Sequence, residues 1–306
     1  MKFSIYQESR TGARQANEDR VSYSYSREAL LMVIADGMGG HLHGEVAAQI
    51  SVQYITEIFQ HDAAPRIRDP ALFLSKALLN AHHAILDYAG DHLLKDAPRT
   101  TCVACIVQDG AAFWAHAGDS RLYLIRKGKV AAQTRDHSRV RMMVDDGLIT
   151  EAEAASHPSR NRIYSCLGGP ASPLIEFSPR TSLRGGDVLV LCTDGVWGPL
   201  GDAKLAQGLA SASVMESVPV LLGQAEHLAG AHCDNLSMMA MRWEDELDGT
   251  TAAAVSTQTL PLEGFTTQME GFSRSRAGAG PGADLTDEEI EKAIQEIQAA
   301  IHKYSK

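Results

Sequence analysis

Two apolar segments of this chain end in the same way, in an aspartate followed by glycine. Residues 30–35 (LLMVIA) run into Asp36, and three of the next four residues are glycine. Residues 188–193 (VLVLCT) run into Asp194 and Gly195. Apolar runs of this length are typical of buried strands. An aspartate at the end of a strand, followed by glycines that carry no side chain, leaves carboxylate and main-chain carbonyl oxygens accessible to a small hard cation. The repetition predicts one site assembled from distant parts of a single core.

Length and charge limit the kinds of partner. The 306 residues can bury one large core, or a core with an appendage. The formal net charge of −10 argues against non-specific binding to nucleic acid or to an anionic membrane surface. Residues 1–8 lack the apolar segment of a signal peptide, and no apolar run approaches 18 residues. We therefore expect no nucleic-acid or membrane partner and a cytoplasmic location.

The cysteines fit a reducing compartment. There are five, an odd number, mostly in apolar surroundings. Cys102 and Cys105 have the spacing of a metal or redox pair, but they lie on a predicted strand, where residues i and i+3 face opposite sides. We interpret them as small buried side chains.

The order of predicted elements indicates an α+β fold. Strands are predicted at about 21–26, 100–107, 112–117, 121–126 and 236–241, besides the two strands above, with helices at about 44–60 and after Pro70. Residues 137–168 interrupt this pattern with short helical pieces and polar turns. Paired strands alternating with pairs of helices predict sheets that pack together and are covered by helices.

The end of the chain differs in composition. We predict a core domain over residues 1–247 and a flexible linker over 248–285, which is rich in Thr, Ala, Gly and Ser. Residues 286–306 begin with a capping box and continue with apolar residues at coiled-coil spacing: Ile290, Ile294, Ile297, Ile301 and Tyr304. So short a helix needs a surface on which to bury its apolar stripe. That surface could be its own core, a second copy or a partner protein.

Acidic residues at predicted strand ends and turns are the candidate metal ligands. They are Glu18, Asp36, Asp119, Asp194 and Asp234. Any one alone is an ordinary turn residue. Brought together, they would repel one another unless cations neutralised them. Oxygen ligands favour Mg²⁺ or Mn²⁺ over Zn²⁺, and two such ions can lower the pKa of a water between them.

One arginine suggests the substrate. Arg14 lies four residues before Glu18, and a guanidinium can bind two phosphate oxygens at once. The chemistry indicated is metal-assisted phosphoester hydrolysis. A serine hydrolase is disfavoured because the chain lacks a Gly-x-Ser-x-Gly elbow, and a nucleotide-binding P-loop because no Lys-Ser/Thr follows the glycines.

The ordered motifs carry a family resemblance. They are Arg14-x-x-Asn17-Glu18-Asp19, Asp36-Gly37-Met38-Gly39-Gly40-His41 with Gly44-Glu45, Thr100-Thr101, Gly118-Asp119-Ser120-Arg121, Asp136-His137-Ser138, Asp194-Gly195 and Asp234-Asn235. Over about residues 1–243 the chain resembles the protein phosphatase 2C family, particularly its bacterial serine/threonine phosphatases. The resemblance implies a central antiparallel β-sandwich flanked by pairs of helices, in four αββα layers.

The resemblance also implies a role for each site residue. Asp36 would bridge two Mn²⁺ or Mg²⁺ ions. Asp194 and Asp234 would be further ligands of the first ion, and Glu18 and the Gly37 carbonyl would be ligands of the second. Asp119 and Asp194 match a weaker third position, and Arg14 matches the phosphate-binding arginine. Asp19 and Asn235 would orient the ligands from outside. Residues 137–168 match a flap whose residues His157, Arg160 and Asn161 would contribute to substrate choice.

The expected function is hydrolysis of phosphoserine and phosphothreonine in proteins, opposing a bacterial serine/threonine kinase. The partners would be phosphoproteins, including that kinase or its substrates. The alternative is a phosphoprotein-binding regulator or scaffold that works through the helix at 286–304.

Overall fold

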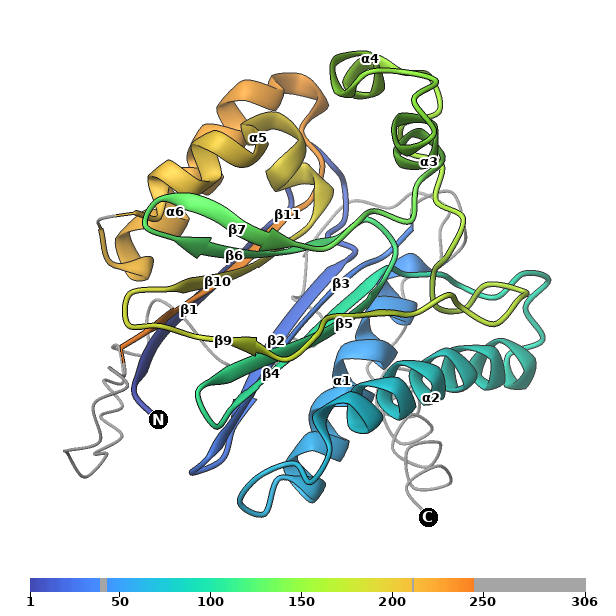
Figure 1. Cartoon of the computed structure of the whole chain (residues 1–306). Coiled ribbons are helices and arrows are strands. Elements are labelled where there is room, and N and C mark those ends of the chain that lie inside the picture. Colours follow the sequence, from blue (N-terminus) through green and yellow to red (C-terminus); the bar gives the residue numbers. More distant parts are fainter. Residues whose placement is uncertain (39–42, 211, 245–306) are drawn as a thin grey trace, which may run out of the picture. The chain divides into compact units, whose positions relative to one another are not determined.

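Two antiparallel sheets form the centre of the molecule (Figure 1). The computed structural model describes residues 1–38, 43–210 and 212–244, all of which fall in one structural unit, Met1–Ala253. The predicted linker at 248–285 and helix at 286–306 lie outside the described residues.

The chain builds each sheet from segments far apart in sequence. The first sheet has the order β1 (Phe3–Arg10), β11 (Leu236–Trp243), β10 (Val188–Cys192), β6 (Arg121–Arg126) and β7 (Lys129–Gln133). The second has the order β2 (Asp19–Tyr25), β3 (Ala29–Asp36), β4 (Cys102–Gln108), β5 (Ala111–Ala117) and β8 (Glu176–Phe177), and β9 (Thr181–Ser182) also pairs with β5. The predicted strands are present, with ends shifted by at most two residues. The sequence reasoning did not anticipate β7 or the two-residue strands β8 and β9.

Alternation along the strands separates two apolar cores. On β10, Leu189 and Leu191 pack between the sheets with Leu30 and Met32 of β3. The alternate residues Val188, Val190 and Cys192 face away from that interface and pack against α5 and α6. Both faces of β10 are therefore buried, which explains its unbroken apolar sequence.

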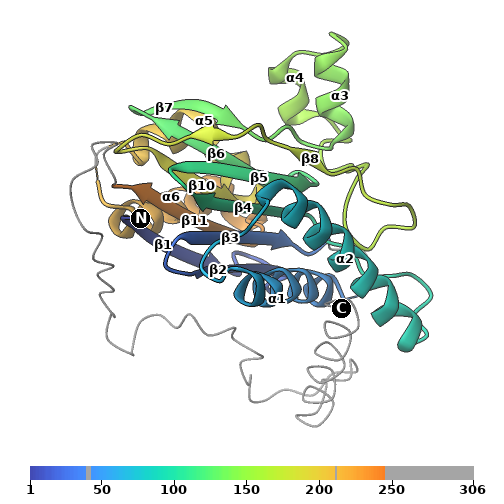
Figure 2. The same cartoon turned by 60° about the horizontal axis from the view of Figure 1, so that its bottom comes forward.

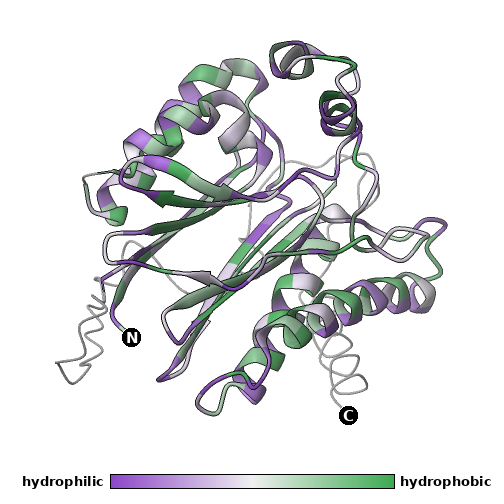
Figure 3. Ribbon diagram, viewed as in Figure 1, coloured by the Kyte–Doolittle hydropathy of each residue, from purple (hydrophilic) through white to green (hydrophobic). Residues whose placement is uncertain are grey.

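Helix pairs cover the outer faces. Helices α1 (Gly44–Asp62) and α2 (Pro70–Asp91) contact the second sheet, and α5 (Asp194–Gly208) and α6 (Val214–Ala229) contact the first. A short 3₁₀ turn, η1 (Gly230–His232), leads into β11. Figure 2 shows the resulting helix–sheet–sheet–helix layering, and Figure 3 shows apolar residues on the strands of the sandwich. This confirms the predicted α+β sandwich.

Two further expectations are confirmed. Cys102 and Cys105 lie on β4 and are fully buried free thiols, and Cys105 belongs to the cluster between the sheets. Residues 137–168 contain only two short helices, α3 (Arg139–Asp145) and α4 (Glu151–Ser156), which stand apart from the sandwich (Figure 2). None of the helices described here combines the length and the apolar character that crossing a membrane requires.

Candidate active site

The sandwich brings the predicted acidic residues to one end. Asp36 ends β3, Asp194 follows β10, and Asp234 precedes β11. Asp19 opens β2 and pairs with Asp36 in the register of the second sheet. A cavity of about 590 Å³ lies at this end, and the predicted residues that line it are Arg14, Glu18, Asp36, Gly37, Asp119, Asn161, Asp194, Asp234 and Asn235.

The loop that carries Arg14 and Glu18 is held by Asn235. The Asn235 side-chain oxygen accepts the Glu18 N–H (2.9 Å). Its side-chain nitrogen donates to the carbonyls of Thr11 and Ala16, each at 2.9 Å. Asn235 thus holds this loop in place, and it also lines the cavity.

A threonine joins the Asp36 and Asp119 segments. The Thr101 hydroxyl oxygen accepts the Asp36 N–H (3.1 Å), and the Thr101 N–H donates to the Asp36 carbonyl (2.9 Å). The same hydroxyl lies 2.7 Å from the Ser120 hydroxyl, next to Asp119. The Thr100-Thr101 pair was visible in the sequence as a motif, but its bridging geometry was not.

Asp19 lies behind the cavity wall. It is 3 % exposed, and its Oδ2 accepts the Thr193 hydroxyl (3.0 Å) next to Asp194. Burial raises the pKa of Asp19 to about 7, although the hydroxyl hydrogen bond opposes the rise. Its Oδ1 is buried with no hydrogen-bond partner among the described residues. Asp19 therefore connects the ends of β2 and β10 from outside the cavity.

The carboxylates of the site destabilise one another when charged. Burial, and then the charges of Asp19 and Asp194, hold the pKa of Asp36 well above its usual range. Burial and the charge of Asp234 raise the pKa of Asp194 to about 6. Burial and the charge of Asp194 likewise raise the pKa of Asp119. A cation in the cavity would relieve both the repulsion and the desolvation.

The backbone around Glu18 is shaped for such a cation. The Glu18 Oε2 atom is buried and has no hydrogen-bond partner within the described part of the chain. A Cβ on Gly44 would collide with this oxygen, and a Cβ on Gly37 would come within 2.5 Å of the Gly44 carbonyl carbon. Together with the all-oxygen donor set, the unpaired carboxylate oxygen fits Mg²⁺ or Mn²⁺.

Gly44→Ala is expected to weaken metal binding. The new methyl group would displace the Glu18 carboxylate, so we expect the apparent Mn²⁺ affinity of the site to fall by about tenfold or more. Calorimetric titration with Mn²⁺ measures the change. Gly90→Ala is the matched control, since a Cβ there meets nothing within 4 Å. Equal affinities in the two variants would contradict the role of Gly44.

Arg14 lies beside the acidic cluster and is partly exposed. Its Nη2 atom is 2.7 Å from Asp234 Oδ2, and 58 % of its side chain is accessible. The other oxygen of Asp234 accepts the Asn235 N–H (2.8 Å). The guanidinium is therefore anchored at one side and has donors left for an oxyanion.

Of the flap residues 137–168, some line the cavity and others do not. Asn161 and Ile163 line it, and sequence reasoning missed Ile163 because an isolated apolar residue in a polar segment gives no signal. His157 and Arg160 are not among the described residues that line the cavity. His157 instead accepts the Ser159 N–H on Nδ1 (3.0 Å), and its carbonyl accepts the Arg160 N–H (3.0 Å).

A second group of possible ligands lies at the edge of the second sheet. Single ligand atoms of His116, His137 and Glu176 fall within 4.8 Å of one another. The Gly118 N–H donates to His137 Nδ1 (3.3 Å), and burial lowers the pKa of His137 to about 4. A neutral ring that accepts a hydrogen bond on Nδ1 carries its proton on Nε2. Within the described residues, His116 Nδ1 and His137 Nε2 are both buried without a hydrogen-bond partner, and His137 Nε2 lies 3.6 Å from Glu176 Oε1.

Comparisons with known proteins agree with this geometry. A sequence profile described as protein phosphatase 2C matches residues 7–229. The serine/threonine protein phosphatase PstP of Mycobacterium tuberculosis is 33 % identical over 229 residues, which cover 74 % of this chain and 42 % of PstP. The chain thus spans less than half the length of that relative. The serine/threonine phosphatase stp of Listeria innocua is 27 % identical over 229 residues, covering 74 % of this chain and 90 % of the relative.

Solved structures show the same similarity. The phosphatase Stp1 from Staphylococcus aureus superposes with a TM-score of 0.74 at 26 % identity, covering 80 % of this chain and 96 % of that one. The catalytic domain of PstP in complex with two manganese ions gives a TM-score of 0.67 at 28 % identity, covering 79 % and 99 %. The profile match covers well over half of the chain. The chain therefore belongs to the protein phosphatase 2C family.

Proposed function

We propose that this chain is a divalent-metal-dependent phosphatase that hydrolyses phosphoserine and phosphothreonine in proteins. The observation that carries the proposal is the convergence of Glu18, Asp36, Asp119, Asp194 and Asp234 in one cavity, with Arg14 beside them. The relatives named as serine/threonine phosphatases, one of them crystallised with two manganese ions, support it.

Within this proposal Asp36 is the shared ligand of two Mn²⁺ or Mg²⁺ ions. Asp194 and Asp234 would be further ligands of one ion, Glu18 and the Gly37 carbonyl would be ligands of the other, and Asp119 with Asp194 would hold a third. Bound divalent cations supply Lewis-acid activation of water and of the phosphoryl group. Asn235, Thr101 and Asp19 fix the backbone from which these ligands project.

The chain's own contribution is to orient the phosphoryl group and to define its approach. Arg14 can offer a pair of parallel N–H donors to two phosphoryl oxygens while Asp234 anchors it. Asn161 and Ile163 of the flap line the same cavity, which supports a role for the flap in contacting the residues around the phosphorylated side chain. We include His157 and Arg160 in this flap role as parts of the turn next to Asn161.

Arg14→Lys is expected to lower kcat/KM for a phosphopeptide by about 10- to 100-fold, because an ammonium cannot form two parallel hydrogen bonds to the phosphoryl group. Steady-state kinetics at saturating Mn²⁺ measure it. Arg27→Lys, at an exposed turn, is the control for loss of an arginine. A kcat/KM equal to that of the control would exclude Arg14 from phosphate binding.

The function itself is tested with the full chain. Purified protein in Mn²⁺ should release phosphate from an aryl phosphate and from phosphoserine and phosphothreonine peptides, and chelation should abolish the release. Absence of turnover in the presence of bound Mn²⁺ would overturn the proposal. Faster turnover of small metabolite esters than of phosphopeptides would overturn the substrate class.

The physiological setting is also a proposal. We infer that the substrates include a serine/threonine kinase or its targets, and that the protein works in the cytoplasm. The five free cysteines support a reducing compartment. The partner or self-docking role of residues 286–304 stays a prediction, and deleting residues 248–306 tests it by comparing partner binding with turnover.

A further inference from the structure

One side chain connects the backbone of Asp119 to the helix that carries Asp194. The indole N–H of Trp197 donates to the Asp119 carbonyl oxygen (3.0 Å). Trp197 lies three residues after Asp194, within the first turn of α5. A single helical turn therefore presents one carboxylate of the cavity and holds the backbone of another.

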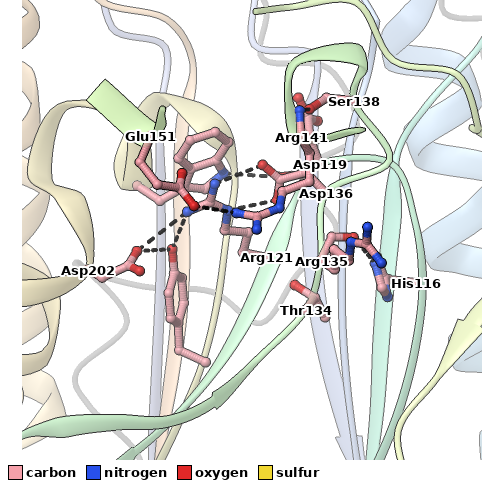
Figure 4. A network of polar contacts seen from close by, with 12 residues as sticks. His116, Asp119, Arg121, Thr134, Arg135, Asp136, Ser138, Arg141, Glu151 and Asp202 are labelled. Atoms are coloured by element: carbon pink, nitrogen blue, oxygen red, sulfur yellow. Dashed lines mark hydrogen bonds and ion pairs between the residues drawn. The ribbon is translucent and has the colours of Figure 1, made fainter. Parts of the chain in front are cut away.

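The indole is itself held in place by Arg121. The guanidinium carbon of Arg121 lies 3.5 Å from the centre of the Trp197 ring. Two hydrogen bonds from Arg121 to Asp136 (2.8 and 2.7 Å), and one to the Tyr123 hydroxyl (2.9 Å), fix the plane of the guanidinium. Figure 4 shows Arg121 between Asp136 and Asp202, beside Asp119. The stack leaves the indole little freedom to turn away from Asp119.

The residue before Asp119 is held from the opposite side. The His137 N–H donates to the Gly118 carbonyl (2.9 Å), and the Gly118 N–H donates to His137 Nδ1 (3.3 Å). Gly118 has a φ of +111°, and a Cβ there would come within 2.6 Å of the Thr101 side chain. Because these contacts fix Gly118, the hydrogen bond from Trp197 sets the orientation of the peptide unit that joins Asp119 to Ser120. The orientation of this unit in turn affects where the Asp119 side chain lies.

We propose that Trp197 is a positioning residue that sets the place of the Asp119 carboxylate relative to Asp194, and through it the affinity for the cation these two carboxylates share. This inference rests on the proposed function. A displacement of a ligand by even 0.5–1 Å, about the tolerance of a metal site, is enough to weaken it. The other interpretation is that Trp197 only fills space against α5, in which case its N–H has no effect on metal binding.

Trp197→Phe separates these interpretations, because it keeps an aromatic ring for Arg121 and removes the N–H donor. Mn²⁺ binding is followed by electron paramagnetic resonance of the free ion, on the full-length protein. Asp119→Asn first identifies the binding step that depends on Asp119. We expect Trp197→Phe to weaken that same step by about three- to tenfold, the effect of one lost hydrogen bond, and to leave the other steps unchanged.

Trp243→Phe is the matched control. Trp243 is buried, at 4 % exposure, whereas Trp197 is partly buried. Trp243 lies at the end of β11, in the core between the sheets. The melting temperature of metal-free protein, measured for both variants, reports any general loss of stability. An Asp119-dependent step that is unchanged in folded Trp197→Phe, or weakened equally in Trp243→Phe, would overturn the inference. Equal weakening of every Mn²⁺ step would also overturn it.

Failure of this inference differs from failure of the proposed function. If wild-type protein binds Mn²⁺ and hydrolyses phosphopeptides but Trp197→Phe binds Mn²⁺ normally, only the role of Trp197 is wrong. If wild-type protein binds Mn²⁺ without hydrolysing any phosphate ester, the proposed function is wrong whatever Trp197 does.

Discussion

Asp36→Asn is expected to reduce kcat/KM for phosphopeptides by on the order of 1,000-fold, because a neutral amide cannot serve as the shared anionic ligand of two cations. Asp36 occupies the end of β3, and its surroundings include Asp19, Asp194, Asp119 and Asp234. In the proposed assignment, substituting any other member of the cluster would leave the ligand shared by these two ions in place. Initial rates at saturating Mn²⁺ give the size of the loss.

The same substitution is expected to stabilise the metal-free protein near pH 8. Burial and neighbouring carboxylates disfavour the charged form of Asp36, as its raised pKa records, and Asn removes that charge. Glu28→Gln removes one charge at the exposed turn before β3, at the opposite end of the same strand. That control should match wild type in activity and in melting temperature. An Asp36→Asn variant with near-normal kcat/KM would contradict the assignment of the shared ligand.

The stabilisation given by Mn²⁺ is expected to grow steeply between pH 5 and pH 8. In the absence of metal the pKa values of Asp19 and Asp194, about 7 and about 6, exceed the ordinary value of 3.8. A carboxyl group with a raised pKa in the folded state favours folding when protonated, and this contribution is lost as pH rises through the folded-state pKa. Metal-free protein should therefore lose several kcal/mol from this site between about pH 4 and pH 7, given about 1.4 kcal/mol per pH unit for each group.

Cation binding requires the deprotonated carboxylates and so has the opposite dependence on pH. At pH 5 protons compete with Mn²⁺ and the increase in melting temperature should be small. At pH 8 it should be larger by roughly 10 °C, since about 1 kcal/mol corresponds to 2–4 °C for a domain of this size. Thermal melts with Mn²⁺ and with chelator across this pH range measure the difference. In Asp36→Asn the dependence should be flatter, and a pH-independent Mn²⁺ effect in wild type would contradict the electrostatic account.

The amino-acid sequence predicted helices, strands and side-chain chemistry well wherever these depend on neighbouring residues alone. Unbroken apolar runs identified β3 and β10, because both faces of each strand are buried. Regular spacing identified α1 and α2. The short strand β7, whose residues alternate between exposed and half-buried, carries little apolar signal and was not anticipated.

The arrangement of the site could be reached from sequence only through the family resemblance. Asp-Gly turns are common, and nothing local to Asp36 indicates that Asp194 lies beside it. The contacts that hold the ligands join residues far apart in the chain, such as Asn235 with the Glu18 loop and Thr101 with Asp36. No spacing rule predicts pairs of this kind.

The sequence by itself determined which residues can bind divalent cations and phosphate, since that depends only on side-chain chemistry. It also determined the layered fold, since apolar periodicity decides which faces must be buried. Only the tertiary structure decided that Trp197 donates to the Asp119 carbonyl, and that Ile163 lines the cavity whereas His157 and Arg160 are not among the described residues that do. The physical reason is that a contact between residues distant in sequence arises from strand register and sheet packing, which the local sequence does not encode.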